Sequence, residues 1–214
     1  QGRVVAHTGR VLDNTNKPKY KNSTNSLIYQ KAEMVFGLSK AKDEIIRSSH
    51  VVVCEGQMDV IRCWQEGLRN MVAVSGSSLT AQMIDRIIRQ TRAKKITLCF
   101  DGDKAGTLAA HRARRELMPM ALSGQVQLKI LCLPEGKDPA DLADVMAAEI
   151  EGSPNWVEWW MNAEFAELDL DTAEGVVSGE RVVKTILREL PDGSLREFVK
   201  TRCKELLKAV PSVA

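Results

Sequence analysis

The sequence predicts an α/β fold: a mostly parallel four-stranded sheet flanked by helices, with a basic N-terminal segment and a C-terminal helical subdomain. Two observations support this prediction. Apolar runs of strand length alternate with amphipathic stretches of helix length over residues 51–142. The flanking regions lack this alternation, because residues 13–26 are polar and residues 151–214 show helical periodicity.

Four apolar runs are expected to form the strands of the sheet. A strand buried on both faces is continuously apolar, and the run of residues 51–54 has this character. The fourth alternates apolar and polar residues, which indicates a strand nearer the sheet edge. The four runs are residues 51–54, 71–74, 96–100 and 126–133, and the helices expected between them are residues 57–66, 79–89 and 105–118.

The regions before and after the predicted sheet differ from it in pattern. Residues 3–5 and 9–12 suggest a short hairpin, and a helix is expected after it at residues 30–36. Towards the C-terminus we expect helices at residues 156–168, 180–189 and 195–207. The chain is therefore divided into a basic segment, a sheet domain and a helical subdomain, with bounds 1–48, 49–146 and 147–214.

Composition limits the class of protein. With 214 residues and 44% apolar content, the chain can bury a sizeable core. No run approaches the roughly 18 apolar residues needed to cross a bilayer, and the first residues lack a signal-peptide pattern. We therefore expect a cytoplasmic protein without a membrane partner. The five cysteines occur singly, which predicts buried thiols rather than disulfides or zinc ligands.

Charge is distributed unevenly along the chain. Residues 1–50 contain nine Lys and Arg against four Asp and Glu, whereas residues 151–214 contain eight against twelve. An ordinary solvated surface would account for such a bias. A surface that binds phosphates would account for it as well.

Carboxylates follow three of the four predicted strands. Glu55 comes after the first run, Asp101 and Asp103 come after the third, and Asp138 and Asp141 follow the fourth. Ligands of open α/β sheets bind at the carboxyl ends of the strands. We therefore expect these acids to meet at one rim, with Glu55, Asp101 and Asp103 as the catalytic set. The alternative for any one of these Asp residues is a helix N-cap.

Acids that converge at one rim repel one another, so a cation is expected among them. Oxygen-only ligands without nearby histidine favour Mg²⁺ or Mn²⁺, and two or more such ions would suit nucleotidyl transfer. Zinc is not expected in this fragment, because the three histidines are isolated from one another and from cysteine pairs.

Several motifs resemble a known superfamily. The string Glu55-Gly56-Gln57-Met58-Asp59, followed by Asp101-Gly102-Asp103-Lys104-Ala105-Gly106, resembles the TOPRIM signature of primases, topoisomerases and OLD-type nucleases. Gly76-Ser77, the string Gly-Lys-Asp-Pro-Ala-Asp at residues 136–141 and the segment 2–23 resemble bacterial DnaG-type primases in the same order. This resemblance implies that residues 49–146 are a TOPRIM-type catalytic domain.

The resemblance also implies a set of metal ligands. The ligands carried over are Glu55, Asp59, Asp101, Asp103 and Asp138, and Glu55 doubles as the general acid and base. Asp141 is not included, because Ala140 separates it from the Asp-Pro pair. For Asp59 the alternative is an ordinary solvated helix acid.

The resemblance implies an RNA polymerase that makes short primers on single-stranded DNA from ribonucleoside triphosphates during replication. Family primases also carry a zinc-ribbon domain and a helicase-binding domain. Neither pattern is present here, and the chain begins with Gln1 within a motif. We therefore expect a fragment of a longer protein, whose replicative helicase would be contacted through a domain absent here.

Basic residues surround one aromatic side chain in the front segment. Basic groups track phosphates and an aromatic ring stacks on bases, which is the combination used to hold single strands. Gly76 and Ser77, at a strand-to-helix turn, could present backbone N–H groups to a triphosphate or could simply cap the next helix. The predicted nucleic-acid and nucleotide contacts are Arg3, Arg10, Lys19, Tyr20, Lys21, Lys31, Gly76 and Ser77.

Two alternatives compete with a primase. One is a TOPRIM module of a topoisomerase or OLD-type nuclease, although the only tyrosines, Tyr20 and Tyr29, both precede the acidic motifs. The other is a non-catalytic scaffold that binds DNA or a partner. Retention of three mutually repelling acids argues against a scaffold, because folding alone would not require them.

Overall fold

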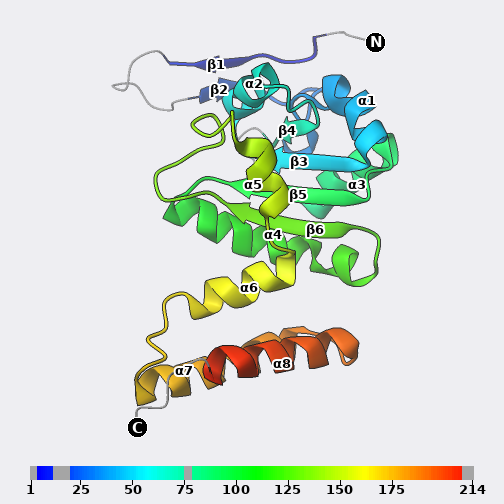
Figure 1. Cartoon of the computed structure of the whole chain (residues 1–214). Coiled ribbons are helices and arrows are strands. Elements are labelled where there is room, and N and C mark those ends of the chain that lie inside the picture. Colours follow the sequence, from blue (N-terminus) through cyan, green and yellow to red (C-terminus); the bar gives the residue numbers. More distant parts are fainter. Residues whose placement is uncertain (1–3, 12–19, 75–78, 209–214) are drawn as a thin grey trace.

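The computed structural model describes residues 4–11, 20–74 and 79–208 (Figure 1). Four of the predicted contact residues, Arg3, Lys19, Gly76 and Ser77, lie outside the described residues. No helix within the described ranges has the length and apolar character that a membrane span needs.

A four-stranded parallel sheet forms the centre of the fold, as predicted. The spatial order of its strands is β4-β3-β5-β6, and each neighbouring pair is parallel. β6 lies at one edge, in agreement with its alternating pattern. The strands are β3 (His50–Cys54), β4 (Met71–Ala73), β5 (Lys95–Phe100) and β6 (Gln127–Cys132).

Helices cover both faces of this sheet, which explains the apolar runs. One face packs against α1 (Leu38–Ser48), α3 (Ala81–Thr91) and α4 (Lys104–Leu122). The other face packs against α2 (Gln57–Gln65) and α5 (Met146–Gly152). Successive residues of a strand therefore enter different cores, so that most residues of β3, β4 and β5 are buried.

A helical region follows the sheet, made of α6 (Trp156–Phe165), α7 (Ala173–Glu189) and α8 (Ser194–Lys208) (Figure 1). Arg114 of α4 joins α7 to the sheet domain. Its side chain is 3% exposed, lies 3.7 Å from the centre of the Trp160 ring and pairs with Glu189 at 2.8 Å. The three tryptophans of α6 are buried, as expected for core residues.

Two expectations for the front of the chain are wrong. The helix expected at residues 30–36 is only a short 3₁₀ turn, Lys31–Glu33, and the longer helix is α1, which starts after Gly37. Only Leu38, Ala41 and Ile45 of α1 are buried, so its apolar face is too sparse to stand out in the sequence.

The hairpin also forms between other segments than expected. β1 (Thr8–Arg10) pairs antiparallel with β2 (Tyr20–Asn22), rather than residues 3–5 with residues 9–12. Most of this hairpin is exposed, so no alternation of apolar and polar residues marks its strands.

Candidate active site

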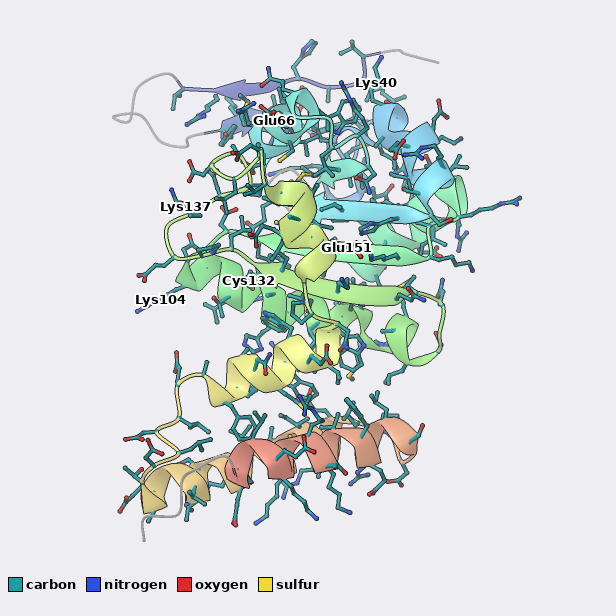
Figure 2. The ribbon with its side chains drawn as sticks, viewed as in Figure 1. Lys40, Glu66, Lys104, Cys132, Lys137 and Glu151 are labelled. Atoms are coloured by element: carbon teal, nitrogen blue, oxygen red, sulfur yellow. The ribbon has the colours of Figure 1, made fainter. Side chains whose placement is uncertain are left out.

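The predicted acids stand where strands end and helices begin. Glu55 follows β3, and Gly56 is the N-cap residue of α2. Asp101 follows β5, and Asp103 is the N-cap residue of α4. Because β3 and β5 are adjacent and parallel, their carboxyl ends lie at the same rim. Lys104 and Lys137, labelled in Figure 2, lie on this side of the molecule.

The turn that holds Asp101 and Asp103 is fixed against the loop after β6. The amide of Gly102 donates to the Lys137 carbonyl at 2.8 Å, and the amide of Gly136 donates to the Gly102 carbonyl at 2.7 Å. A Cβ atom on residue 102 would lie 1.8 Å from the Pro134 carbonyl oxygen, so only glycine fits here. This contact holds the loop that leads into Asp138 beside the acids of β5.

Asp103 also acts as a helix cap, which was the alternative considered for a single Asp. Its Oδ1 accepts a hydrogen bond from the Gly106 amide at 2.6 Å. Such a bond satisfies an N–H group that has no partner within the helix. The cap bond engages Oδ1 of Asp103, which leaves Oδ2 to coordinate a metal ion.

Asp59 is buried rather than solvated, with 9% of its surface exposed. Its carboxylate lies against Gly56, because a Cβ atom there would come 2.1 Å from Asp59 Oδ2. Burial, together with the negative charges of Asp138, Asp101 and Glu55, raises the pKa of Asp59 to about 6. Asp59 therefore interacts electrostatically with Glu55, Asp101 and Asp138, and these four residues together with Asp103 are called the acid rim.

Glu55 feels the same accumulation of negative charge. Partial burial raises its pKa above the ordinary value, and Asp101 and Asp103 add to the effect. The rim thus carries an electrostatic cost that a divalent cation would offset.

Asp138 and Asp141 bind each other's backbone. The Asp141 amide donates to Asp138 Oδ1 at 2.8 Å, and the Asp138 amide donates to Asp141 Oδ2 at 3.3 Å. Asp141 thus stabilises the loop that carries Asp138, which gives it a structural role beside the predicted ligand.

Within the described ranges, no three or more His, Cys, Asp or Glu side chains already converge closely enough to hold one ion. The structure brings the predicted acids to one rim, but several of their carboxylate oxygens are engaged by backbone amides. The metal-ligand set of Glu55, Asp59, Asp101, Asp103 and Asp138 therefore stays a prediction.

Three of the predicted nucleic-acid contacts lie on the β1–β2 hairpin. Arg10 and Tyr20 are paired across the two strands, and the Arg10 guanidinium carbon lies 5.7 Å from the centre of the Tyr20 ring. Lys21 is exposed beside them, and Lys31 lies in the 3₁₀ turn that follows. The hairpin thus presents Arg10 and Tyr20 together on one face and Lys21 on the other.

Two hollows border the rim and include residues that the sequence did not indicate. A pocket of about 300 Å³ is lined by Glu55 and Phe100 and by Arg112 of α4. A second hollow, a groove of about 600 Å³, is lined by Asp101 and Asp103 and by the acids Glu135 and Glu167. Arg112 lies two helical turns after Lys104, so its position could have been found by extending α4 from the rim.

Comparison with known proteins identifies the family to which this fold belongs. Residues 52–143 match the family model described as Toprim-like, and residues 1–42 match the model of the DNA primase catalytic core, N-terminal domain. A DNA primase from Synechococcus elongatus is 36% identical over 205 residues, which cover 92% of this chain and 29% of that relative.

Solved structures agree with these matches. A structure described as the DnaG catalytic core superimposes with a TM-score of 0.75 and 30% identity, over 99% of this chain and 68% of that one. A DnaG primase catalytic domain bound to ssDNA gives a TM-score of 0.75 and 31% identity, over 95% and 66% of the two chains.

The fold and its rim of acids define a Toprim-type catalytic core. The chain belongs to the DnaG-type DNA primase family, as the resemblance of its motifs predicted. It spans less than a third of the length of the primase from Synechococcus elongatus.

Proposed function

We propose that this chain is part of a DNA primase and provides the metal-dependent site that joins ribonucleotides into short RNA primers on single-stranded DNA. The observation that carries the proposal is the placement of Glu55, Asp59, Asp101 and Asp103 at one rim of a parallel sheet, in a chain of the primase family. The alternatives of a topoisomerase, a nuclease or a scaffold are not favoured, because the similar proteins are DNA primases.

The residues present fit a hard divalent cation. All five proposed ligands, Glu55, Asp59, Asp101, Asp103 and Asp138, supply carboxylate oxygen, and the pKa of both Glu55 and Asp59 is raised partly by the other acids. Carboxylates that repel one another in this way favour Mg²⁺ or Mn²⁺ over softer metals. When bound, two such ions would stabilise the attacking and the leaving oxygen during phosphoryl transfer.

The side chains of this rim and of the hairpin have different proposed roles. Glu55 is the proposed general base, because its carboxylate stands at the rim and can accept the proton of the attacking hydroxyl. Asp101 and Asp103 are held by the Gly102 turn, so their carboxylates reorganise little between substrates. On the hairpin, Arg10 and Lys21 are placed to bind phosphates and Tyr20 to stack on a base.

The proposed substrates are ribonucleoside triphosphates and a single-stranded DNA template. One similar protein is described as bound to ssDNA, which supports the template. A replicative helicase is the proposed partner of the whole primase, through a region outside this chain.

Template-directed incorporation of labelled ribonucleotides tests the proposal. The chain is mixed with single-stranded DNA and the four ribonucleoside triphosphates, with Mg²⁺, with Mn²⁺ or with excess chelator. We expect short RNA products in both metals and none with chelator. Binding of Mn²⁺ by the chain alone, followed by calorimetry, provides a second readout. Absence of both RNA synthesis and Mn²⁺ binding would refute the proposed site.

A further inference from the structure

A chain of hydrogen bonds connects the hairpin to the first turn of α2. Gln57 Nε2 donates to Thr8 Oγ1 at 3.2 Å, and Thr8 Oγ1 donates to Asn22 Oδ1 at 2.6 Å. Thr8 and Asn22 face each other in the register of β1 and β2. Gln57 thus contacts the hairpin at the Thr8–Asn22 pair, which has one residue on each strand.

The backbone of Gln57 lies beside the acid rim. Gln57 is the first residue of α2, two residues after Glu55 and two before Asp59. The helix is anchored by Val60 and Cys63, which are buried in the core on that face of the sheet. The backbone of Gln57 is therefore held with the rim, and its side-chain amide extends from there to the hairpin.

The opposite end of the hairpin bears the proposed template contacts. Arg10 and Tyr20 are paired two residues along the strands from Thr8 and Asn22, which is about 7 Å at the usual rise of a strand. Three paired rows connect the two ends of this short ribbon. A change in the orientation of the Thr8–Asn22 pair therefore also changes the orientation of the Arg10–Tyr20 pair.

Among the described residues, little else holds the orientation of the hairpin. Five of its six residues are exposed, so it buries almost no apolar surface. Isolated two-stranded hairpins are at best marginally stable in water. A side-chain contact from a rigid helix therefore has a large influence on where this hairpin lies.

We propose that Gln57 is a positioning residue for the template: through Thr8 and Asn22 it sets the orientation of Arg10 and Tyr20 relative to the acid rim. The part of this inference that concerns the template rests on the proposed function. The mechanical part, that Gln57 orders the hairpin, stands without it.

Hydrogen exchange of the hairpin amides tests the mechanical part. In Gln57→Ala, exchange in residues 8–10 and 20–22 should accelerate about three- to tenfold, as expected for loss of one net hydrogen bond. Gln65→Ala, at the other end of the same helix, is the matched control and should leave these rates unchanged. Unchanged hairpin exchange in Gln57→Ala would overturn the proposal.

The hydroxyl of Thr8 makes the test specific to this contact. Thr8→Val should accelerate exchange at least as much as Gln57→Ala, because it also removes the Thr8–Asn22 bond, and Thr8→Ser should keep the parent rates. In the Thr8→Val background, Gln57→Ala should have little further effect. An acceleration by Gln57→Ala that is as large in this background as in the parent would show that the two residues act independently, against the proposal.

Steady-state kinetics test the functional part. Gln57→Ala should raise the KM for single-stranded template about three- to tenfold while kcat stays near that of the parent, and Thr8→Ser should behave as the parent does. A fall in kcat with unchanged KM would contradict a role in template positioning. If the parent itself makes no primers, the proposed function fails, and the exchange experiment still decides whether Gln57 orders the hairpin.

Discussion

The acid rim and the β1–β2 hairpin lie next to each other but are attached to the molecule in different ways. The acids directly follow strands whose residues are buried on both faces, such as Val53 at 4% and Leu98 at 1% exposure. The hairpin is mostly exposed and connects to α2 through Gln57. Residues of the rim therefore derive their precision from the core, whereas those of the hairpin derive it from a few polar contacts.

This difference predicts how each region responds to mutation. Changes at the rim should affect catalysis or the fold strongly, because the surrounding backbone cannot relax. Changes in the hairpin should affect binding while the stability of the protein stays nearly constant. Four variants test this contrast, in order of the expected effect.

Gly102→Ala should have the largest effect, because it should reduce both the stability of the fold and the activity of the site. The added Cβ would lie 1.8 Å from the Pro134 carbonyl oxygen, so the β6 loop must shift away from the acids. We expect a loss of roughly 3 kcal/mol in the free energy of unfolding, measured by denaturant titration, together with loss of primer synthesis. Gly152→Ala is the control, because its Cβ would meet no atom within 4 Å. Equal stability of the two variants would show that the turn is not tightly packed.

Asp101→Asn should abolish activity while the fold is retained. An amide has nearly the same shape as a carboxylate but lacks the charge that holds a hard divalent ion. We expect primer synthesis to fall by about a hundredfold or more, with a melting temperature in the presence of chelator that is no lower than that of the parent, because one of the repelling charges is removed. Asp43→Asn, on the exposed side of α1, should behave as the parent does. Near-parental activity at limiting Mg²⁺ would remove Asp101 from the proposed ligands.

Asp59 should make the stability of the metal-free protein depend on pH. Its pKa of about 6 in the folded state is above the ordinary value of 3.8, so the fold favours the protonated form. Its ionisation therefore destabilises the fold above pH 6, and this cost is relieved as the pH falls from 6 towards 4.

Asp59→Asn should remove this dependence. With chelator present, we expect the variant to exceed the parent by roughly 1–2 kcal/mol at pH 7.5 and to match it near pH 4, as measured by urea unfolding. Asp43→Asn should change neither value. A parent whose stability is flat between pH 4 and 7.5 would show that Asp59 does not carry the unfavourable charge.

The sheet and its acids could be predicted from the sequence because local pattern and tertiary position coincide there. A strand buried on both faces is apolar at every residue, and an acid that directly follows such a run must emerge at the rim. Glu55 and Asp101 were identified for this reason. The burial of Asp59 was not evident, because it depends on the close approach of its carboxylate to Gly56.

The hairpin and α1 were harder to predict because their patterns are weak or non-local. The buried residues of α1, Leu38, Ala41 and Ile45, have helical spacing but are only three of its eleven residues, and the sequence prediction places the helix several residues too early. The hairpin is paired through polar residues such as Thr8 and Asn22, and its contact with Gln57 joins residues 49 positions apart. A single sequence contains no local signal for such a contact.

Arg10→Ala should have the smallest effect on the fold and so gives the sharpest test of the contrast between the two regions. Arg10 is exposed and packs only loosely over Tyr20, at 5.7 Å, so its removal should change the free energy of unfolding by less than about 0.5 kcal/mol. If its guanidinium binds a template phosphate, affinity for single-stranded DNA should fall, and the slope of log K against log salt should become shallower by about 0.7. Arg89→Ala, an exposed change on α3, should leave both affinity and slope as in the parent. An unchanged slope in Arg10→Ala would mean that the hairpin is a solvated surface, and that the template contacts the protein elsewhere along the rim.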